Sequence, residues 1–147
     1  MSKTAITFTS IFLLLICGFV TIDADAAGVS HAAAKASATK AATAWLKLID
    51  AGDYAASWNA AGSYFKEHVT EDQWTQKVGP ARRSLGAVVS RKIKIAKYMT
   101  TLPGAPDGQY VVIQYQSSFE HKKSAVETVT PMLDKDGQWR VSGYYIR

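Results

Sequence analysis

The stretch Tyr110-Val-Val-Ile-Gln-Tyr-Gln-Ser-Ser-Phe-Glu120 alternates between apolar and polar side chains. A period of two residues places successive side chains on opposite faces of the backbone, so the pattern predicts a β-strand with one buried face. The apolar positions of this strand are Val111, Ile113, Tyr115 and Phe119. The strand therefore indicates an antiparallel sheet that is covered on one side and solvated on the other.

Three further segments on either side of this stretch predict strands, at residues 88–98, 125–133 and 139–146. In the first, we expect Ile93 and Ile95 to share one face, with Lys92 and Lys94 on the other. The last two segments are joined by Asp134-Lys-Asp-Gly137, a composition typical of a tight hairpin turn. The four strands therefore predict an antiparallel meander.

The preceding part of the chain has helical periodicity, with apolar residues three or four positions apart. A first helix is expected from Ala38 to Gly52, and a second, beginning after Asp53, carries aromatic residues as far as Phe65. A third begins with the Thr70/Gln73 capping pair, is expected to kink or split at Gly79-Pro80 and ends near Ser84.

Helices followed by strands predict an α+β fold, in which the helices pack on one face of a curved four-stranded sheet. We expect one domain over residues 38–147, preceded by a flexible tail at residues 27–37 that is rich in Ala, Ser and Thr.

Residues 1–26 resemble a cleavable signal peptide, with Lys3, an apolar run from Ile6 to Val20 and small residues before the cleavage position. The alternative, a retained membrane anchor, is disfavoured because the run is shorter than the roughly 20 residues that span a bilayer. We therefore expect a periplasmic or secreted protein without a transmembrane segment after cleavage. Removal of the leader raises the formal net charge from +5 to +6, and it removes the single cysteine, Cys17, so no disulfide can form.

Several blocks of the chain resemble an exported bacterial family, the domain-of-unknown-function family 4019. The blocks are Ala44–Trp58, Gln73-Trp74, Arg83–Gly86, Pro103–Val111 and Gly137–Ile146, and the resemblance covers about residues 38–147. It implies export but no particular activity. The order of elements is also similar to the cystatin-like, nuclear-transport-factor-2-like architecture. In that architecture a bent sheet surrounds an enzyme pocket, a ligand pocket or a filled core.

Glu127 interrupts an apolar strand, and Arg91 has the same parity as Ile93 and Ile95 in another. If both point toward the helices, they form a buried pair or the polar floor of a pocket, in which a carboxylate can act as a base. The alternative turns Glu127 to solvent and points Val126, Thr128, Thr130 and Met132 inward. Periodicity does not decide between the two.

Aromatic side chains are abundant, and Trp58 and Tyr115 are the candidates that join Arg91 and Glu127 in such a pocket. The ordinary role of these aromatics is core packing. No catalytic constellation, cofactor loop or metal-ligand spacing is present in the sequence, and export together with solvated lysines disfavours nucleic-acid binding.

Three hypotheses for function follow from these patterns. The first is a non-catalytic binding or interaction module whose partner is a small ligand or an envelope protein. The second is a small enzyme that uses Glu127 as a base in a cone-shaped pocket. The third is an envelope structural or assembly protein that forms a homodimer through the open face of its sheet.

Overall fold

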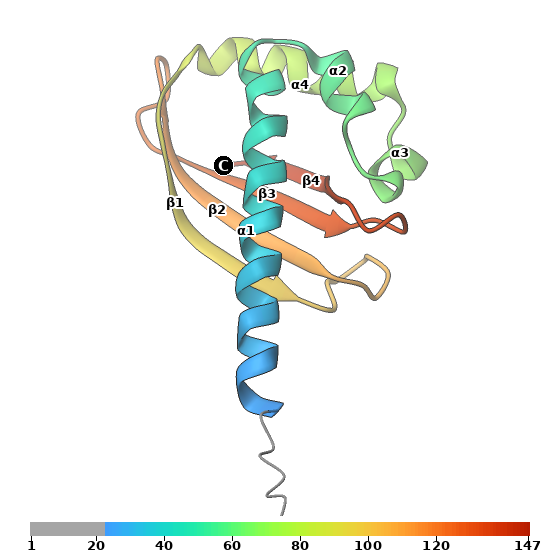
Figure 1. Ribbon diagram of the computed structural model, residues 1–147. Helices are drawn as coiled ribbons and strands as arrows, with labels where there is room; N and C mark the ends of the chain where they lie inside the picture. The colour runs from blue at the N-terminus through green and yellow to red at the C-terminus, as the bar shows by residue number, and fades with distance from the viewer. Residues whose placement is uncertain (1–22) are drawn as a thin grey trace, which may run out of the picture.

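The computed structural model describes residues 23–147, so most of the expected signal peptide, residues 1–22, lies outside the described residues. Four helices precede four strands (Figure 1). The elements are α1 (Asp23–Asp50), α2 (Tyr54–Asn59), α3 (Ser63–His68), α4 (Glu71–Leu85), β1 (Val88–Met99), β2 (Tyr110–Phe119), β3 (Ala125–Leu133) and β4 (Trp139–Ile146). The predicted α+β fold is confirmed.

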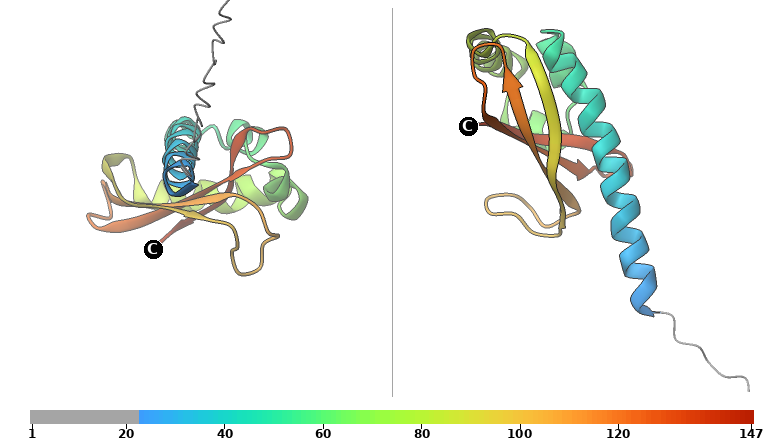
Figure 2. Two further views of the ribbon diagram at one scale, coloured as in Figure 1. Left: turned by 60° about the horizontal axis from the view of Figure 1, so that its bottom comes forward. Right: turned by 90° about the vertical axis from the view of Figure 1, so that its left-hand side faces the viewer.

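The strands form one antiparallel sheet in the order β1-β2-β3-β4, as the meander prediction required. The sheet curves around α1, which crosses its concave face, while α2, α3 and α4 gather at one end (Figures 1 and 2). This arrangement fits the cystatin-like architecture expected from the order of the elements.

The core lies between α1 and the concave face of the sheet. Trp45 and Ile49 of α1 pack there on Ile113, Val129 and the other inward residues of the central strands. Aromatic rings fill the end under α4, where the ring of Trp74 lies 5.8 Å from that of Trp45 and 5.1 Å from that of Phe65, centroid to centroid. Burial of so much apolar area provides the main stabilisation of a domain without disulfides.

A β-bulge in β1 changes the expected orientation of its side chains. Ile93 pairs with Tyr115 on the concave face, whereas Ile95 pairs with Gln114, which has the opposite orientation. The prediction that Ile93 and Ile95 share a face was therefore wrong. An extra residue between them shifts the register by one, and a simple count of alternation does not detect such an insertion.

The second expected helix is two helices in the structure. α2 ends at Asn59 and α3 begins at Ser63, and between them the backbone N–H of Gly62 donates a hydrogen bond to the carbonyl of Val141 in β4 (2.8 Å). Because this hydrogen bond holds Gly62 against β4, the backbone between α2 and α3 is not helical. α4, in contrast, continues through Pro80 to Leu85 without a break.

α1 is longer at its start than expected. It begins at Asp23 and includes residues 27–37, for which the sequence suggested a flexible tail. The alanine content of this segment favours a helix, and the ring of His31 stacks on that of Tyr98 in β1 (4.2 Å between centroids). The beginning of α1 extends beyond the sheet (Figure 2). Among the helices of residues 23–147, none combines the length and the apolar character needed to cross a membrane.

Each end of α4 is defined by a specific contact. The side chain of Thr70 accepts a hydrogen bond from the backbone N–H of Gln73, and the side chain of Gln73 accepts one from the N–H of Thr70, which forms the predicted capping box. Gly86 follows the helix with φ of 76°, and a Cβ there would lie 2.7 Å from the carboxylate of Glu120. These two ends set the position of Arg82 relative to the sheet.

Candidate functional site

Glu127 lies on the concave face of β3, in the same row as Ala125 and Val129. Its side chain has an exposed fraction of 0 %. The buried alternative from the sequence therefore describes the structure, and the solvent-facing alternative was wrong, because Thr128 and Thr130 occupy the partly exposed outer face. A fully buried carboxylate requires compensating partners, since desolvation of an unpaired charge is very costly.

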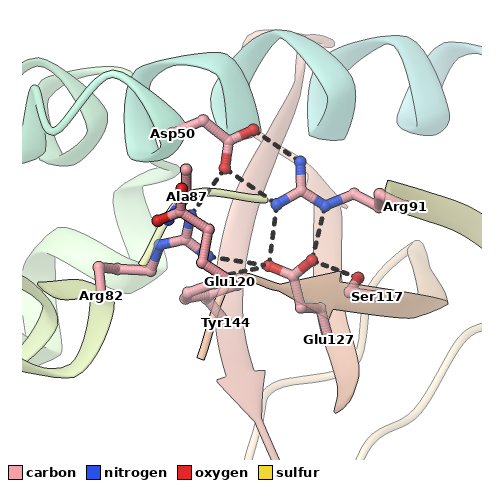
Figure 3. Close-up of polar contacts among 8 residues, drawn as sticks. All are labelled: Asp50, Arg82, Ala87, Arg91, Ser117, Glu120, Glu127 and Tyr144. Carbon is pink, nitrogen blue, oxygen red and sulfur yellow. Dashed lines mark hydrogen bonds and ion pairs between the residues drawn. The ribbon is translucent and has the colours of Figure 1, made fainter. Parts of the chain in front are cut away.

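Four hydrogen bonds provide that compensation (Figure 3). One oxygen of Glu127, Oε2, accepts from Nε of Arg91 (2.6 Å) and from the hydroxyl of Ser117 (2.5 Å). The other, Oε1, accepts from Nη2 of Arg91 (3.1 Å) and from the hydroxyl of Tyr144 (2.7 Å). A carboxylate has about four acceptor positions, so these donors fill its hydrogen-bonding capacity.

Arg91 connects Glu127 to the end of α1. Its Nη1 donates to Oδ2 of Asp50 (2.7 Å) and its Nη2 to Oδ1 of Asp50 (2.9 Å), so the guanidinium binds two carboxylates with paired hydrogen bonds. Such paired geometry is the strongest form of arginine–carboxylate contact. Arg91 therefore holds α1 and β3 in a fixed position relative to β1.

Arg82 of α4 is the second cation of this group, and its side chain is only 5 % exposed. Its Nη2 donates to Oδ1 of Asp50 (3.0 Å), and its Nη1 lies 3.7 Å from Oε1 of Glu127, an ion pair without a hydrogen bond. The guanidinium carbon lies 4.6 Å from the ring centroid of Phe119. Among the residues that the structure describes, Nε and Nη1 of Arg82 have no hydrogen-bond acceptor.

We call Asp50, Arg82, Arg91 and Glu127 the buried ion cluster. It contains two cations and two anions, so its formal charge is zero. Burial alone lowers the pKa of Arg91, but hydrogen bonds from Arg91 to Asp50 and Glu127 outweigh that effect and raise it above the ordinary value. Burial, followed by the negative charge of Glu127, raises the pKa of the Tyr144 hydroxyl. Arg91 therefore remains a cation, and Tyr144 remains a neutral hydrogen-bond donor to Glu127, over the ordinary pH range.

Two of the four sequence candidates, Arg91 and Glu127, thus meet in the arrangement that the sequence left open as one of two alternatives. Tyr115 is their neighbour, since it pairs with Glu127 across β2 and β3, and burial raises the pKa of its hydroxyl. Trp58 lies elsewhere. It is partly buried at the edge of the core, and its indole N–H donates to the carbonyl of Val69 (2.7 Å).

The sequence analysis did not assign Asp50, Arg82, Ser117 or Tyr144 to this site. For two of these residues, the sequence pattern indicates a position on a buried face. Arg82 follows Val78 and Trp74 at four-residue spacing and so shares the apolar face of α4, and Ser117 has the inward parity of Tyr115 and Phe119. A polar residue on a buried face needs a partner, and this rule could have identified both.

Two clefts are lined in part by residues of the buried ion cluster. The first, the α1–β1 cleft, has a volume of about 370 Å³ and is lined by Thr43, Leu46, Lys47, Asp50, Arg91, Ile93 and Tyr115. It contains Arg91 and Tyr115 from the sequence prediction. Its lining combines the carboxylate of Asp50 with two cations, so it has no strong preference for either sign of charge.

The second, the α4–β4 cleft, has a volume of about 390 Å³. Its lining contains three basic side chains and no carboxylate, and otherwise consists of apolar and aromatic residues and one serine. The residues are Trp74, Lys77, Val78, Ala81, Arg82, Ser84, Leu85, Lys122, Tyr144, Tyr145 and Ile146. Arg82 and Tyr144 therefore belong both to the polar network of Glu127 and to the wall of this cleft.

Metal binding has no support in the described part of the chain. Within residues 23–147, no three His, Cys, Asp or Glu side chains lie together in a way that could hold a metal ion. The carboxylates of the cluster instead bind arginine, serine and tyrosine donors.

Comparison with known families gives one match. The model of a family described as "Protein of unknown function (DUF4019)" matches residues 41–144, and the chain belongs to this family. The matched segment contains the whole buried ion cluster and all residues of the α4–β4 cleft except Tyr145 and Ile146. No curated protein matches the chain.

Proposed function

We propose that this member of the DUF4019 family is an exported, non-catalytic binding module that takes a small ligand in the α4–β4 cleft. The observation that carries this proposal is the cleft itself, which has apolar walls, three basic side chains and no carboxylate. Its volume of about 390 Å³ is within the range of about 300–1,000 Å³ that is typical of small-molecule sites.

The state of Glu127 supports binding over catalysis. A general base needs a free lone pair within hydrogen-bond reach of the proton that it removes. Both oxygens of Glu127 are occupied by two donors each, and Glu127 lines neither cleft. We therefore assign the carboxylate a structural task, which is to hold Arg82 and Tyr144 in the wall of the cleft.

Export forms part of the same proposal and rests on the leader pattern of residues 1–26. A periplasmic or secreted location is consistent with a domain whose stability depends on its core. The direct check is the mass of the protein recovered from the periplasm or medium of a bacterial host that expresses the full chain. We expect an N-terminus at Ala27 or Gly28, and recovery of the intact precursor would contradict export.

The cleft is tested with a variant that fills it. Ala81 is exposed and lines the cleft, so Ala81→Phe places a ring in the space without a change in charge. Ala36→Phe is the matched control, because Ala36 is exposed on α1 and lines neither of the two clefts. Native mass spectrometry of each protein, purified without ligand exchange, measures any small molecule that remains bound.

We expect the unmodified protein and Ala36→Phe to carry a bound small molecule that Ala81→Phe lacks. Equal occupancy in all three proteins would place the ligand outside the α4–β4 cleft and overturn the proposal. Absence of any bound molecule, together with no binding in the titrations below, would also overturn it.

A further inference from the structure

We infer that the ligand of the α4–β4 cleft is a small amphipathic anion, which has an apolar body and one acidic headgroup. This inference rests on the proposed function and adds the chemical class of the ligand. Two features of the described residues carry it, namely the apolar wall and two lysines without carboxylate partners.

The apolar wall comes from both sides of the cleft. Trp74, Val78 and Leu85 contribute from α4, and Tyr145 and Ile146 contribute from the end of β4. Tyr145 is 61 % exposed, so a large ring at the cleft meets water in the unoccupied protein. A ligand that covers this surface with hydrocarbon gains the free energy of apolar burial.

The acidic headgroup is indicated by Lys77 and Lys122. Both side chains are exposed and both line the cleft, one from α4 and the other from the turn between β2 and β3. Within residues 30–147, all ion pairs are made by arginines, so neither lysine is neutralised by a carboxylate there. Two uncompensated cations at the mouth of an apolar cleft complement an anion on an apolar body.

The charge of its lining distinguishes the α4–β4 cleft from the α1–β1 cleft. Arg82 is paired with Asp50 and Glu127, so the uncompensated positive charge in the lining of the α4–β4 cleft comes from Lys77 and Lys122. The α1–β1 cleft differs in this respect, because Asp50 lies in its lining. Of these two clefts, the α4–β4 cleft has basic side chains without an acidic one, and the α1–β1 cleft has both.

The test compares three ligands with the same ten-carbon chain: decanoate, decanol and decyltrimethylammonium. Each is titrated into the purified protein below its micelle concentration, and binding is measured by calorimetry and by tryptophan fluorescence, for which Trp74 is the reporter. We expect decanoate to bind roughly tenfold more tightly than decanol, since it adds charge-assisted contacts, and the ammonium compound to bind most weakly.

Variants test whether the preference for decanoate depends on the two lysines of the cleft. Lys77→Gln combined with Lys122→Gln is expected to weaken decanoate binding to about the level of decanol, and to leave decanol binding unchanged. Lys94→Gln combined with Lys97→Gln changes the net charge equally at exposed positions of β1 that line neither cleft, so it controls for the overall charge. Ala81→Phe is expected to abolish binding of all three ligands.

The outcomes separate the two proposals. Equal affinity for decanoate and decanol, both lost in Ala81→Phe, would overturn the anion while the cleft remains the binding site. If none of the three ligands binds, but a molecule retained by the purified protein is lost in Ala81→Phe, the anion is again overturned and the cleft remains the binding site. If the control lysine pair weakens decanoate as much as the cleft pair, the preference comes from net charge, and the inference is also overturned.

Discussion

The described residues contain two groups of arginine–carboxylate pairs. The two groups have the same chemistry but differ in burial and in the distance along the chain between their partners. The buried ion cluster joins α1, α4, β1 and β3 through partners that lie 32 to 45 residues apart in the chain. The second group, which we call the hairpin ion pairs, consists of Asp134, Asp136 and Arg140 at the β3–β4 turn. There, Arg140 binds a carboxylate only four residues away (2.7 Å and 2.8 Å).

The comparison shows how environment sets the energetic role of one type of contact. Water and salt screen the hairpin ion pairs, so they contribute little to stability. Inside the buried ion cluster, formation of the pairs roughly balances the cost of desolvation, but removal of one member leaves its partners buried and uncompensated. We therefore expect equivalent substitutions in the two groups to have very different effects.

The largest effect is expected from Glu127→Gln. The substitution keeps the size of the side chain but removes its charge, which leaves Arg82 and Arg91 with Asp50 as their only anion. Loss of one partner from a buried pair costs about 3–5 kcal/mol of the free energy of unfolding. Urea denaturation of the variant and the unmodified protein measures this difference.

Asp136→Asn is the matched control, because it makes the same chemical change in the hairpin ion pairs. A loss for Glu127→Gln that is no greater than for Asp136→Asn would contradict the distinction between the two groups. If Glu127→Gln does not fold, the smaller substitution that follows tests the same network.

A smaller effect is expected from Tyr144→Phe. This change removes only the hydroxyl that donates to Glu127 and keeps the ring, which packs 5.2 Å from the ring of Trp45. A hydrogen bond to a charged group contributes about 1.5–3 kcal/mol. Thermal and urea unfolding measure the loss, and Tyr145→Phe is the control because Tyr145 is largely exposed. Equal stability of the two variants would show that the hydroxyl of Tyr144 adds nothing to the cluster.

A still smaller effect is expected from Arg140→Gln. It removes the cation of the hairpin ion pairs, but the turn keeps its backbone hydrogen bonds, and Asp134 keeps its contacts with the N–H and hydroxyl of Ser63 (2.9 Å and 2.6 Å). The change in the free energy of unfolding should be several times smaller than for Tyr144→Phe and should shrink further in high salt. A loss as large as that for Tyr144→Phe would mean that the surface pairs are not screened.

The smallest effect is a pH dependence of the hairpin. The hydrogen bonds from Arg140 lower the pKa of Asp136 to about 2, and the hydrogen bond from the hydroxyl of Ser63 contributes most to lowering that of Asp134. Because the unfolded chain binds protons more readily than the folded one, the contribution of Asp136 is complete above about pH 4. It is lost as the pH falls toward about 2.

Acid titration of the free energy of unfolding, with Asp136→Asn as the comparison, isolates that contribution. We expect the difference between the two proteins to shrink as the pH falls from about 4 to about 2. A difference that does not change with pH would show that Asp136 has the same proton affinity in the folded and unfolded states.

The sequence by itself determined much of this protein, because many of its signals are local. The alternation of residues 110–119, the Thr70/Gln73 capping box and the Asp134–Gly137 turn each depend on neighbours within a few positions. Such patterns predicted the four strands nearly to the residue, the start of α4, the antiparallel meander and the α+β fold. The hairpin ion pairs also join residues that are close in the chain, but the sequence analysis predicted only the turn that carries them.

Only the tertiary structure decided the features that depend on partners far apart in the chain. The hydrogen bond from Gly62 to Val141 separates α2 from α3, and the bulge in β1 turns Ile95 away from the face of Ile93. The burial of Glu127 is the clearest case, because its strand pattern allowed either orientation. A carboxylate can face the core only when donors from other elements meet it there, and the folded chain alone brings Arg82, Arg91, Ser117 and Tyr144 to that position.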